Sequence, residues 1–410
     1  MFSSKSKLDH NLKDYISKNA YKSYRILIQY KDFQSSVVKK ISSYKGTVHH
    51  IIESSNIISA ELNSRGIDRI SEYPEIKKIY LDEYLFLCGM SVTTANKIHF
   101  SEKYSLSGAG VGIGLVDSGI FPHQDLTSPS TKIELFEDLI NNFRYPYDDN
   151  GHGTSMAGIL CSSGISSNNM YKGICNKSKL FCYKAFDKLG KGFASDILYS
   201  IESLSNISKE NNIKVLCLPF ELLTHNTFII SCFDLTFKYA ISKGLIPIVP
   251  SGSNLSEKTS IMGIATLPSC ITIGGLNSTT SIMKPYTYSS AGPYGKLLKP
   301  DLSAACVNII SLNSDNNYIS EKNGIKVYPN KLEVPYKTFT GSSIATAYIS
   351  GLCALLCEKN PSITFKDMIS LLKVACDPID EISNQIQGEG IVNINKLIIW
   401  LFILMNIIHI

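Results

Sequence analysis

The chain has 410 residues, of which 44% are hydrophobic and 18% charged, and this balance places it among soluble globular proteins with more than one domain. Its net charge is only +5 and its lysines are spread along the chain, so we expect no nucleic-acid partner. The 11 cysteines occur without CxxC pairs, and the opening stretch MFSSKSKLDHNLKDY contains no apolar secretion signal. These features predict a cytoplasmic protein with reduced thiols and argue against a disulfide framework or a zinc site.

A small α+β domain is predicted for residues 22–90, after an N-terminal extension formed by residues 1–21. The patterns in YRILIQY, GTVHHII, NIISAEL and KKIYLDEYLF predict strands, and those in SSVVKKISSY and GIDRISEYPEI predict helices. The resulting order is βαββαβ, which predicts a ferredoxin-like fold.

A larger domain is predicted for residues 91–396. Compact apolar runs suit strands that are buried on both faces of a parallel sheet, and they are GVGIGLVDSGI, KLFCYKAF, KVLCLPF, LIPIVPSG and CITIGGL. Two stretches between them, SDILYSIESLSNIS and CFDLTFKYAISKG, have the spacing of crossover helices. We therefore expect an α/β fold, with a mostly parallel sheet, helices on both faces and a functional site at the carboxyl ends of the strands.

A nucleophile is the first functional residue that the pattern suggests. In TFTGSSIATAYISGLCALLCEK a Gly-Ser-Ser turn leads into an apolar helix, residues 344–357, which places Ser343 beside free backbone N–H groups that could stabilise an oxyanion. Taken alone, the stretch is better explained by an N-capping serine on a core helix. The hypothesis of a nucleophile therefore depends on a base and an acid elsewhere in the chain.

One candidate exists for each of these roles. His152 lies between two glycines, just before a helical run at residues 155–160, and Asp117 closes an apolar strand. An aspartate that caps a turn is the alternative for Asp117. The chain order Asp, His, Ser is one in which the catalytic triad of serine hydrolases occurs.

Three motifs resemble the signature boxes of the subtilisin-like serine protease family. They are DSG at Asp117, GHGTSMAG at His152 and TGSSIATA at Ser343. Further stretches that are similar to family segments are PSCITIGG, SSAGPYGKLLKPDLSA and GEGIVNINK, and the resemblance covers about residues 92–396. It implies a subtilisin-like fold and a serine endopeptidase whose partners are peptide or protein substrates.

The resemblance also implies the role of each residue. Ser343 would attack the peptide carbonyl, His152 would take and return the proton, and Asp117 would orient the imidazole. No cofactor or metal ligand is predicted. Structural calcium cannot be argued from the sequence, because no clustered carboxylate loop of the EF-hand type is present.

The oxyanion loop departs from the family pattern. Where the family has an Ala-Ala-Gly-Asn run, whose Asn donates to the oxyanion, the chain has VPSGSNLSE, so that Ser253 aligns with that Asn and Asn254 follows it. Losing such a donor costs about 2.7–4 kcal/mol of transition-state stabilisation. Ser253 and Asn254 both remain candidates for the oxyanion donor, and a plain turn role is the alternative for Asn254.

The strand that pairs with substrate departs as well. The family's Ser-Leu-Gly run corresponds here to Cys217, Leu218 and Pro219, which we predict to be substrate-binding residues. Since proline has no backbone N–H, pairing with an extended peptide should be altered on that side. Two smaller departures, Ala305-Cys306 and Ala347, stand where the family usually has Pro-Gly and proline.

Before a subtilisin-like domain, the small α+β domain resembles the family's inhibitory propeptide. We therefore expect an intramolecular inhibitor that the enzyme cuts away within about residues 85–107. A permanently attached accessory domain is the alternative, because a fold alone does not define a function.

The apolar C-terminal tail, residues 397–410, lies beyond the family-like region. Its 14 residues are too few to cross a hydrocarbon core of ~30 Å, which needs about 20. A packed helix or a partner contact is favoured over a membrane anchor, because the tail has no basic face.

The chain as a whole is thus predicted to be a self-processing serine endopeptidase. The alternative from another class is a pseudoprotease that binds a peptide or a partner without cutting it, which the altered oxyanion loop would allow.

Overall fold

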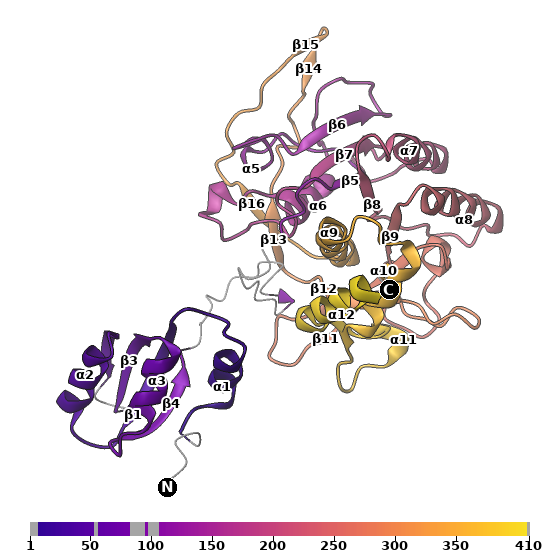
Figure 1. The fold of residues 1–410 in the computed structure, drawn as a ribbon. Helices are drawn as coiled ribbons and strands as arrows, with labels where there is room; N and C mark the ends of the chain where they lie inside the picture. Colours follow the sequence, from indigo (N-terminus) through magenta and orange to yellow (C-terminus); the bar gives the residue numbers. More distant parts are fainter. Residues whose placement is uncertain (1–6, 53–55, 83–94, 97–105, 408–410) are drawn as a thin grey trace. The chain divides into compact units, whose positions relative to one another are not determined.

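The computed structural model describes residues 7–52, 56–82, 95–96 and 106–407 (Figure 1). The chain divides into two compact units, Met1–Leu87 and Cys88–Ile410, and each has a hydrophobic core of its own. The expected junction within residues 85–107 lies largely outside the described residues.

The first unit is a four-stranded antiparallel sheet with the order β2-β3-β1-β4. Its elements are β1 (Tyr24–Tyr30), α2 (Gln34–Ser43), β2 (Thr47–Ile52), β3 (Ile57–Leu62), α3 (Ser64–Ser71) and β4 (Ile76–Leu81). This order and pairing confirm the ferredoxin-like prediction. One face of the sheet is apolar, since Ile26 and Ile28 of β1 are fully buried with the helices.

Part of the predicted N-terminal extension contributes to this unit. Helix α1 (His10–Ser17) lies in it, and Leu12 of this helix is fully buried in the core of the unit. Just before the helix, Leu8 forms a parallel bridge with Ile79 of β4.

The second unit is built on a ten-stranded sheet with the order β17-β18-β12-β10-β9-β8-β5-β7-β6, in which β11 also pairs with β10. The strands are β5 (Gly112–Asp117), β6 (Ile133–Asp138), β7 (Lys179–Lys184), β8 (Ile213–Cys217), β9 (Ile246–Pro250), β10 (Ile271–Asn277), β11 (Lys284–Pro285), β12 (Leu302–Ala305), β17 (Cys376–Asp377) and β18 (Ile391–Val392). Pairing is parallel from β6 across to β18, whereas β11 and β17 pair antiparallel. The five strands predicted from apolar runs form the centre of this sheet.

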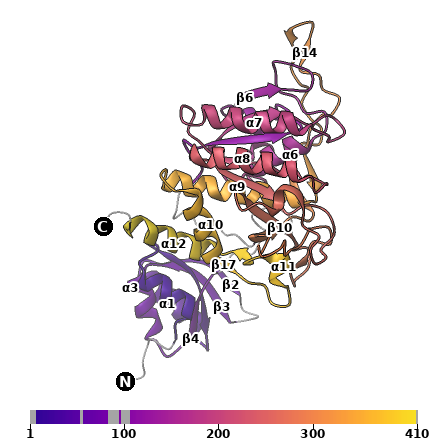
Figure 2. The same ribbon diagram turned by 90° about the vertical axis from the view of Figure 1, so that its right-hand side faces the viewer.

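Helices cover both faces of the sheet, as expected (Figure 1). Helices α7 (Ala194–Ile207) and α8 (Thr227–Ser242) lie side by side on one face (Figure 2). The opposite face carries α6 (His152–Cys161), α9 (Ser342–Lys359), α10 (Phe365–Val374) and α12 (Ile394–Ile407). Two shorter helices are α5 (Gln124–Thr127) and α11 (Asn384–Gln387), and single 3-10 turns lie at Ile165–Ser167 and Gly263–Thr266.

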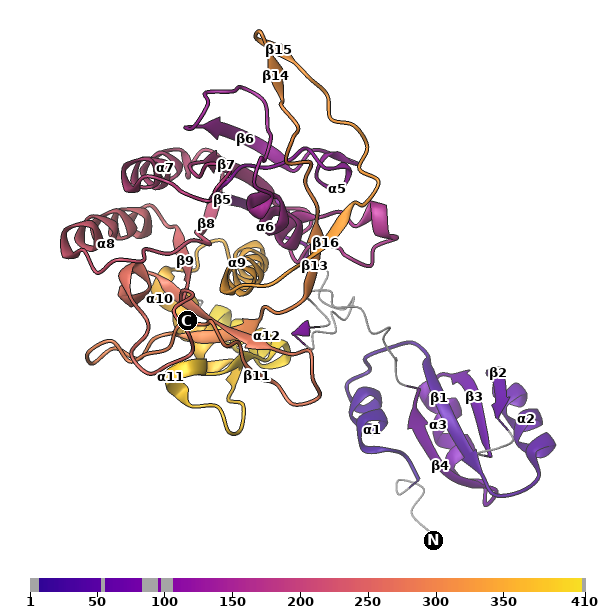
Figure 3. The same ribbon diagram turned by 180° about the vertical axis from the view of Figure 1, so that it is seen from behind.

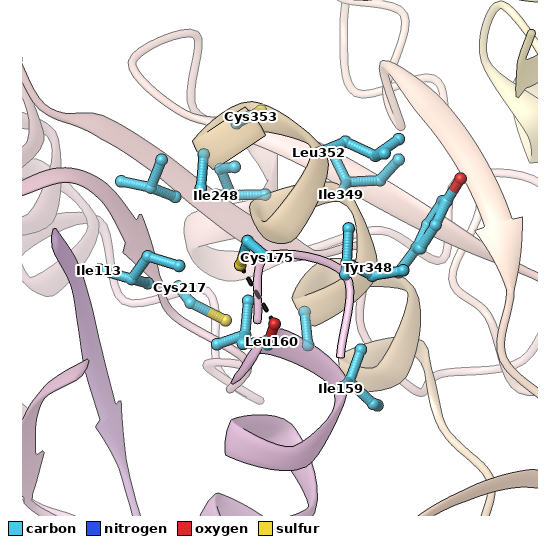
Figure 4. Packing of buried hydrophobic residues seen from close by; sticks show 14 of the residues in the cluster. Ile113, Ile159, Leu160, Cys175, Cys217, Ile248, Tyr348, Ile349, Leu352 and Cys353 are labelled. Atoms are coloured by element: carbon cyan, nitrogen blue, oxygen red, sulfur yellow. Dashed lines mark hydrogen bonds between the residues drawn. The ribbon is translucent and has the colours of Figure 1, made fainter. Parts of the chain in front are cut away.

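The core has two layers because the central strands are apolar on both sides. Successive side chains of a strand point to opposite faces. In β5, Ile113 and Leu115 accordingly join the layer under α6 and α9, whereas Val116 joins the layer under α7 and α8. Helix α9 is buried around most of its circumference, and its Ile349 and Leu352 belong to the same core cluster as Ile113 of β5 (Figure 4).

Most cysteines lie inside these layers. All ten cysteines of the described part of the chain are free thiols, and nine of them are buried, with Cys232 half-buried. The Cys175 thiol donates a hydrogen bond of 3.2 Å to the carbonyl of Leu160 (Figure 4). Burial raises the pKa of Cys182, Cys217 and Cys353 above the usual thiol value.

A long insertion separates two paired strands next to α6. Strands β13 (Ile309–Leu312) and β16 (Tyr336–Phe339) are antiparallel, and between them β14 (Glu321–Lys322) and β15 (Ile325–Lys326) form a projecting hairpin (Figure 3). The base of the insertion contacts the loop before α6, since the Ser314 hydroxyl donates to the carbonyl of Asp148, 2.8 Å away.

The C-terminal tail continues α12, which begins at Ile394. Leu397 and Leu401 of this helix are buried in the main core, so that the described part of the tail is a packed helix. Within the described residues, every helix is too short or too polar to cross a membrane.

Candidate active site

Asp117 and His152 meet at the carboxyl edge of the sheet. Asp117 is the last residue of β5, and His152 is the first residue of α6. The imidazole Nδ1 of His152 lies 2.8 Å from Oδ1 and 3.0 Å from Oδ2 of the Asp117 carboxylate. The Asp117 carboxylate also binds the next residue of the chain, because the Ser118 backbone N–H donates to Oδ1 at 2.7 Å.

Glycine at position 153 allows the two segments to approach this closely. A Cβ atom on Gly153 would lie 2.1 Å from the carbonyl oxygen of Gly119 and 3.1 Å from the Cβ of Asp117. Any larger residue would therefore push α6 away from the turn that follows β5. This contact explains physically why the histidine is followed by glycine in GHGTSMAG.

The environment of His152 favours its protonated form. Burial acts to lower the pKa of the imidazole, but the adjacent Asp117 carboxylate and the charge of Asp148 outweigh burial and raise the pKa above 6.5. The His152 side chain is 38% exposed whereas that of Asp117 is 4% exposed, so the face of the imidazole away from Asp117 is open to a substrate.

Ser343 lies in the first turn of α9, as the sequence predicts. Its hydroxyl donates a hydrogen bond to the carbonyl of Pro219, 2.8 Å away, and no hydrogen bond joins it to His152 within the described part of the chain. The helix N-terminus supplies backbone N–H groups that lack partners inside the helix. Ser343 therefore lies at the expected helix start, and its hydroxyl points toward the segment after β8.

The loop after β9 lies beside the same helix start. The Ser342 hydroxyl donates to the carbonyl of Gly252 at 3.2 Å, which ties the loop to α9. Both donors of Ser253 are already hydrogen-bonded, since its backbone N–H donates to Oε2 of Glu221 at 2.9 Å and its hydroxyl donates to Oε1. Asn254 differs, because its side-chain Nδ2 is buried and has no hydrogen-bond partner among the residues that the structure describes.

The three predicted substrate-binding residues at the end of β8 are all buried. The side chains of Cys217 and Leu218 join opposite core layers, and the Leu218 backbone N–H already donates to the carbonyl of Ile248 at 3.0 Å. Pro219 is also buried, and its carbonyl accepts the Ser343 hydroxyl. Their role in substrate binding stays a prediction.

Sequence reasoning missed two acidic residues at this edge. Asp148 is fully buried and accepts backbone N–H groups at the start of α6, and Glu221 holds Ser253. The signal for Asp148 was its place four residues before His152, where an acidic side chain suits a helix N-terminus. No pattern in the sequence links Glu221 to Ser253. Across the described residues, no three His, Cys, Asp or Glu side chains are grouped as a metal site.

Comparisons with known proteins show the family of the chain. Residues 108–390 match the model of the subtilase family. The serine protease AprX of Bacillus subtilis is 32% identical over 352 residues, which are 82% of this chain and 78% of AprX. Subtilisin E of Bacillus subtilis is 24% identical over 371 residues, which are 88% of this chain and 86% of that protein. Among solved structures, sphericase superposes with a TM-score of 0.60 at 21% identity, covering 74% of this chain and 97% of sphericase.

The fold and the comparisons together define the class. An α/β sheet with this order, matched along most of its length by the family model, belongs to subtilisin-like proteins. The chain is a member of the subtilase family and is a subtilisin-like serine endopeptidase.

Proposed function

We propose that the enzyme cleaves peptide bonds of peptide or protein substrates through Asp117, His152 and Ser343. The proposal is carried by the pairing of the His152 Nδ1 with the Asp117 carboxylate at 2.8 Å. That hydrogen bond fixes the tautomer in which Nε2 is free to accept a proton. Ser343 attacks the carbonyl and forms an acyl-enzyme, His152 returns the proton to the leaving amine, and water then releases the acid product.

The Ser343 hydroxyl changes its hydrogen-bond partner in this mechanism. It donates to the carbonyl of Pro219 in the free protein, and the mechanism requires it to leave that carbonyl for His152 by a change of rotamer. Catalytic hydrogen bonds are often long or unmade in free enzymes and tighten only with substrate bound. The Pro219 contact therefore describes a resting rotamer of the nucleophile.

Asn254 is the better supported oxyanion donor. The Ser253 hydroxyl donates to the Glu221 carboxylate, whereas the buried Asn254 amide nitrogen has no acceptor within the described part of the chain. An unpaired buried donor is costly unless a ligand uses it, and a developing oxyanion is such a ligand. The backbone N–H of Ser343, at the start of α9, supplies the second donor.

The first unit is proposed to act as an intramolecular inhibitor that the enzyme removes. Support comes from its ferredoxin-like fold, from its separate core and from its place before the subtilisin-like domain. The proposed cleavage lies within about residues 85–107.

A fluorophosphonate probe, which acylates activated serines, tests the proposed nucleophile. We expect stoichiometric labelling of the wild type on the peptide that contains Ser343, and no labelling of Ser343→Ala. Ser350→Ala is the matched control, because Ser350 is a fully buried serine of the same helix, about two turns after Ser343. Wild type that is folded, freed of its first unit and still unlabelled would overturn the mechanism and favour a peptide-binding pseudoprotease.

A further inference from the structure

One buried carboxylate near the site has no role in the proposed mechanism. Asp148 is fully buried in the loop before α6. Its Oδ1 accepts the Ser118 hydroxyl at 2.9 Å and the backbone N–H groups of Gly151 and Asn150 at 2.8 and 3.1 Å. Its Oδ2 accepts the backbone N–H and the hydroxyl of Thr154 at 2.8 and 2.6 Å.

These five hydrogen bonds join two segments that are far apart in sequence. The Ser118 hydroxyl, which follows Asp117 directly, also accepts the backbone N–H of Gly153 at 3.0 Å. The Thr154 hydroxyl in turn accepts the backbone N–H of Phe121 at 2.8 Å. The turn after β5 and the first turn of α6 are thus tied to each other through hydroxyls that Asp148 orients.

Backbone N–H dipoles stabilise the negative charge of Asp148. The nearby buried cation, Lys184, pairs instead with Asp149 at 2.6 Å and donates to the carbonyl of Ser118, also at 2.6 Å. Asp148 is stabilised by the N–H groups at the N-terminus of α6, which favours a negative charge. With Asp117, it is one of the two carboxylates whose charge acts on His152.

We propose that Asp148 is a positioning residue for catalysis: its carboxylate fixes the first turn of α6 against the turn after β5 and so holds His152 in line with Asp117. The proposal rests on the proposed roles of Asp117 and His152. An ionised carboxylate is needed, because an asparagine has only one acceptor oxygen and its amide would face N–H groups as a second donor. In Asp148→Asn the amide N–H2 must face at least one backbone N–H donor, so at least one of the five hydrogen bonds is lost and a hydroxyl has to reverse its direction.

The test compares Asp148→Asn with a matched variant, Asp138→Asn. Asp138 is likewise a buried carboxylate at a strand end, and its oxygens accept three backbone N–H groups and the Tyr147 hydroxyl. It makes no hydrogen bond to the turn after β5 or to α6 in the described structure. Both substitutions should lower stability alike, so that thermal unfolding controls for a general loss of structure.

Only Asp148→Asn should alter catalysis. We expect its kcat to fall about tenfold to a hundredfold with little change in KM, because misplacing a catalytic group by an ångström costs up to about a hundredfold. The midpoint of the acidic limb of kcat/KM should also move to lower pH, because a negative charge that raises the pKa of His152 has been removed. Equal kcat values and equal midpoints in the two variants would overturn the proposal.

A second readout does not require activity. In a Ser343→Ala background, NMR titration of the His152 ring should give a lower pKa with Asp148→Asn than without it, and an unchanged pKa with Asp138→Asn. If the proposed triad were wrong but Asp148 still held His152, this shift would appear without any peptidase activity. An unchanged pKa in both variants would overturn the proposal whatever the enzyme does.

Should Asp148→Asn fail to fold, Ser118→Ala replaces it. This variant removes the single hydroxyl that bridges Asp148 and Gly153, and we expect a fall in kcat of about two- to tenfold with KM unchanged. Wild-type kcat in a folded Ser118→Ala would overturn the proposal.

Discussion

The imidazole of His152 is open on one side and bound to a carboxylate on the other. This arrangement separates two requirements of a general base, access to the nucleophile and a fixed tautomer. The same carboxylate raises the pKa of the imidazole, so that the resting enzyme holds a proton at a higher pH than a free histidine would.

The pH dependence of activity follows from that shift. His152 must be neutral to act as a base, and since its pKa lies above 6.5, kcat/KM should rise with pH through a midpoint above 6.5. Asp117→Asn should lower the midpoint and reduce kcat by about 10⁴-fold, because the favourable charge and the correct tautomer are both lost. A pH-rate profile of the two proteins checks this, and an unchanged midpoint in Asp117→Asn would contradict it.

The oxyanion donor is the second prediction for single residues. Asn254→Ala should lower kcat about a hundredfold or more with little change in KM, since the hydrogen bond forms mainly in the transition state. Ser253→Ala should have a smaller effect, because the Ser253 hydroxyl donates to Glu221. Steady-state kinetics on one peptide substrate separates the two, and the reverse ranking would assign the donor to Ser253.

The motifs indicated which residues form the candidate site but not which hydrogen bonds join them. DSG and GHGTSMAG were sufficient to expect Asp117 near His152, because strand ends and helix starts meet at one edge of a parallel sheet. The choice between Ser253 and Asn254 was not available from the sequence. It depends on Glu221, which lies 32 residues before Ser253 and meets it only after folding.

Short helix α5 is linked to the strand pair next to α6 by a buried histidine. His123 caps α5, because its Nδ1 accepts the Asp125 backbone N–H at 3.0 Å, and its Nε2 donates to the carbonyl of Pro335 at 3.0 Å. The Tyr336 hydroxyl, from β16, donates to the Asp125 carboxylate. The imidazole is therefore held neutral, with one ring nitrogen as acceptor and the other as donor.

Acid should destabilise the protein at this position. Burial lowers the pKa of His123 below 6.5, against the opposing charge of Asp125, so the unfolded chain binds a proton that the folded protein does not. The contribution of His123 to stability is present above about pH 6.5 and is lost as the pH falls below that value. His123→Gln, which does not titrate, should show a shallower loss of unfolding free energy between about pH 6.5 and 5 in urea titrations. Equal slopes for both proteins would contradict this prediction.

Helix α12 anchors the end of the chain through one face. Leu401 is 1% exposed in the main core, whereas its neighbour Trp400 is 43% exposed. Leu401→Ala should lower the free energy of unfolding by about 2–5 kcal/mol, the range for buried leucines, and Trp400→Ala should lower it far less. Urea denaturation of both variants tests whether the tail is a structural helix, and equal losses would argue against its packing.

Elements were predictable from sequence where they are buried on both faces. The runs at β5, β7, β8, β9 and β10 were found because a central parallel strand is continuously apolar. Strand β6 was missed because it lies at the sheet edge: among its residues, Ile133–Asp138, only the last is buried, and three carry acidic side chains. Strands β14 and β15, of two residues each, are too short for any periodicity to mark them.

Two units with separate cores make up the whole molecule, and this organisation allows one to be removed from the other. If the enzyme processes itself, purified wild type should lose a fragment close to Met1–Leu87 in size, while Ser343→Ala should keep its full mass. Intact mass spectrometry over a time course measures this. Ser350→Ala serves as the control that still processes, and full-length wild type under conditions where it cleaves peptides would assign the first unit to a permanent accessory domain.

The buried cysteines make thiol labelling a measure of unfolding in the second unit. No cysteine occurs before Cys88, so a thiol-reactive dye does not label the first unit. Within the described residues, Cys232 is the half-buried thiol that a dye would reach first, while the other nine lie in the interior. A buried neutral thiol reacts only when the chain around it opens. The rate at which the interior cysteines take up dye therefore reports how often the catalytic unit unfolds, whether or not the first unit is still attached.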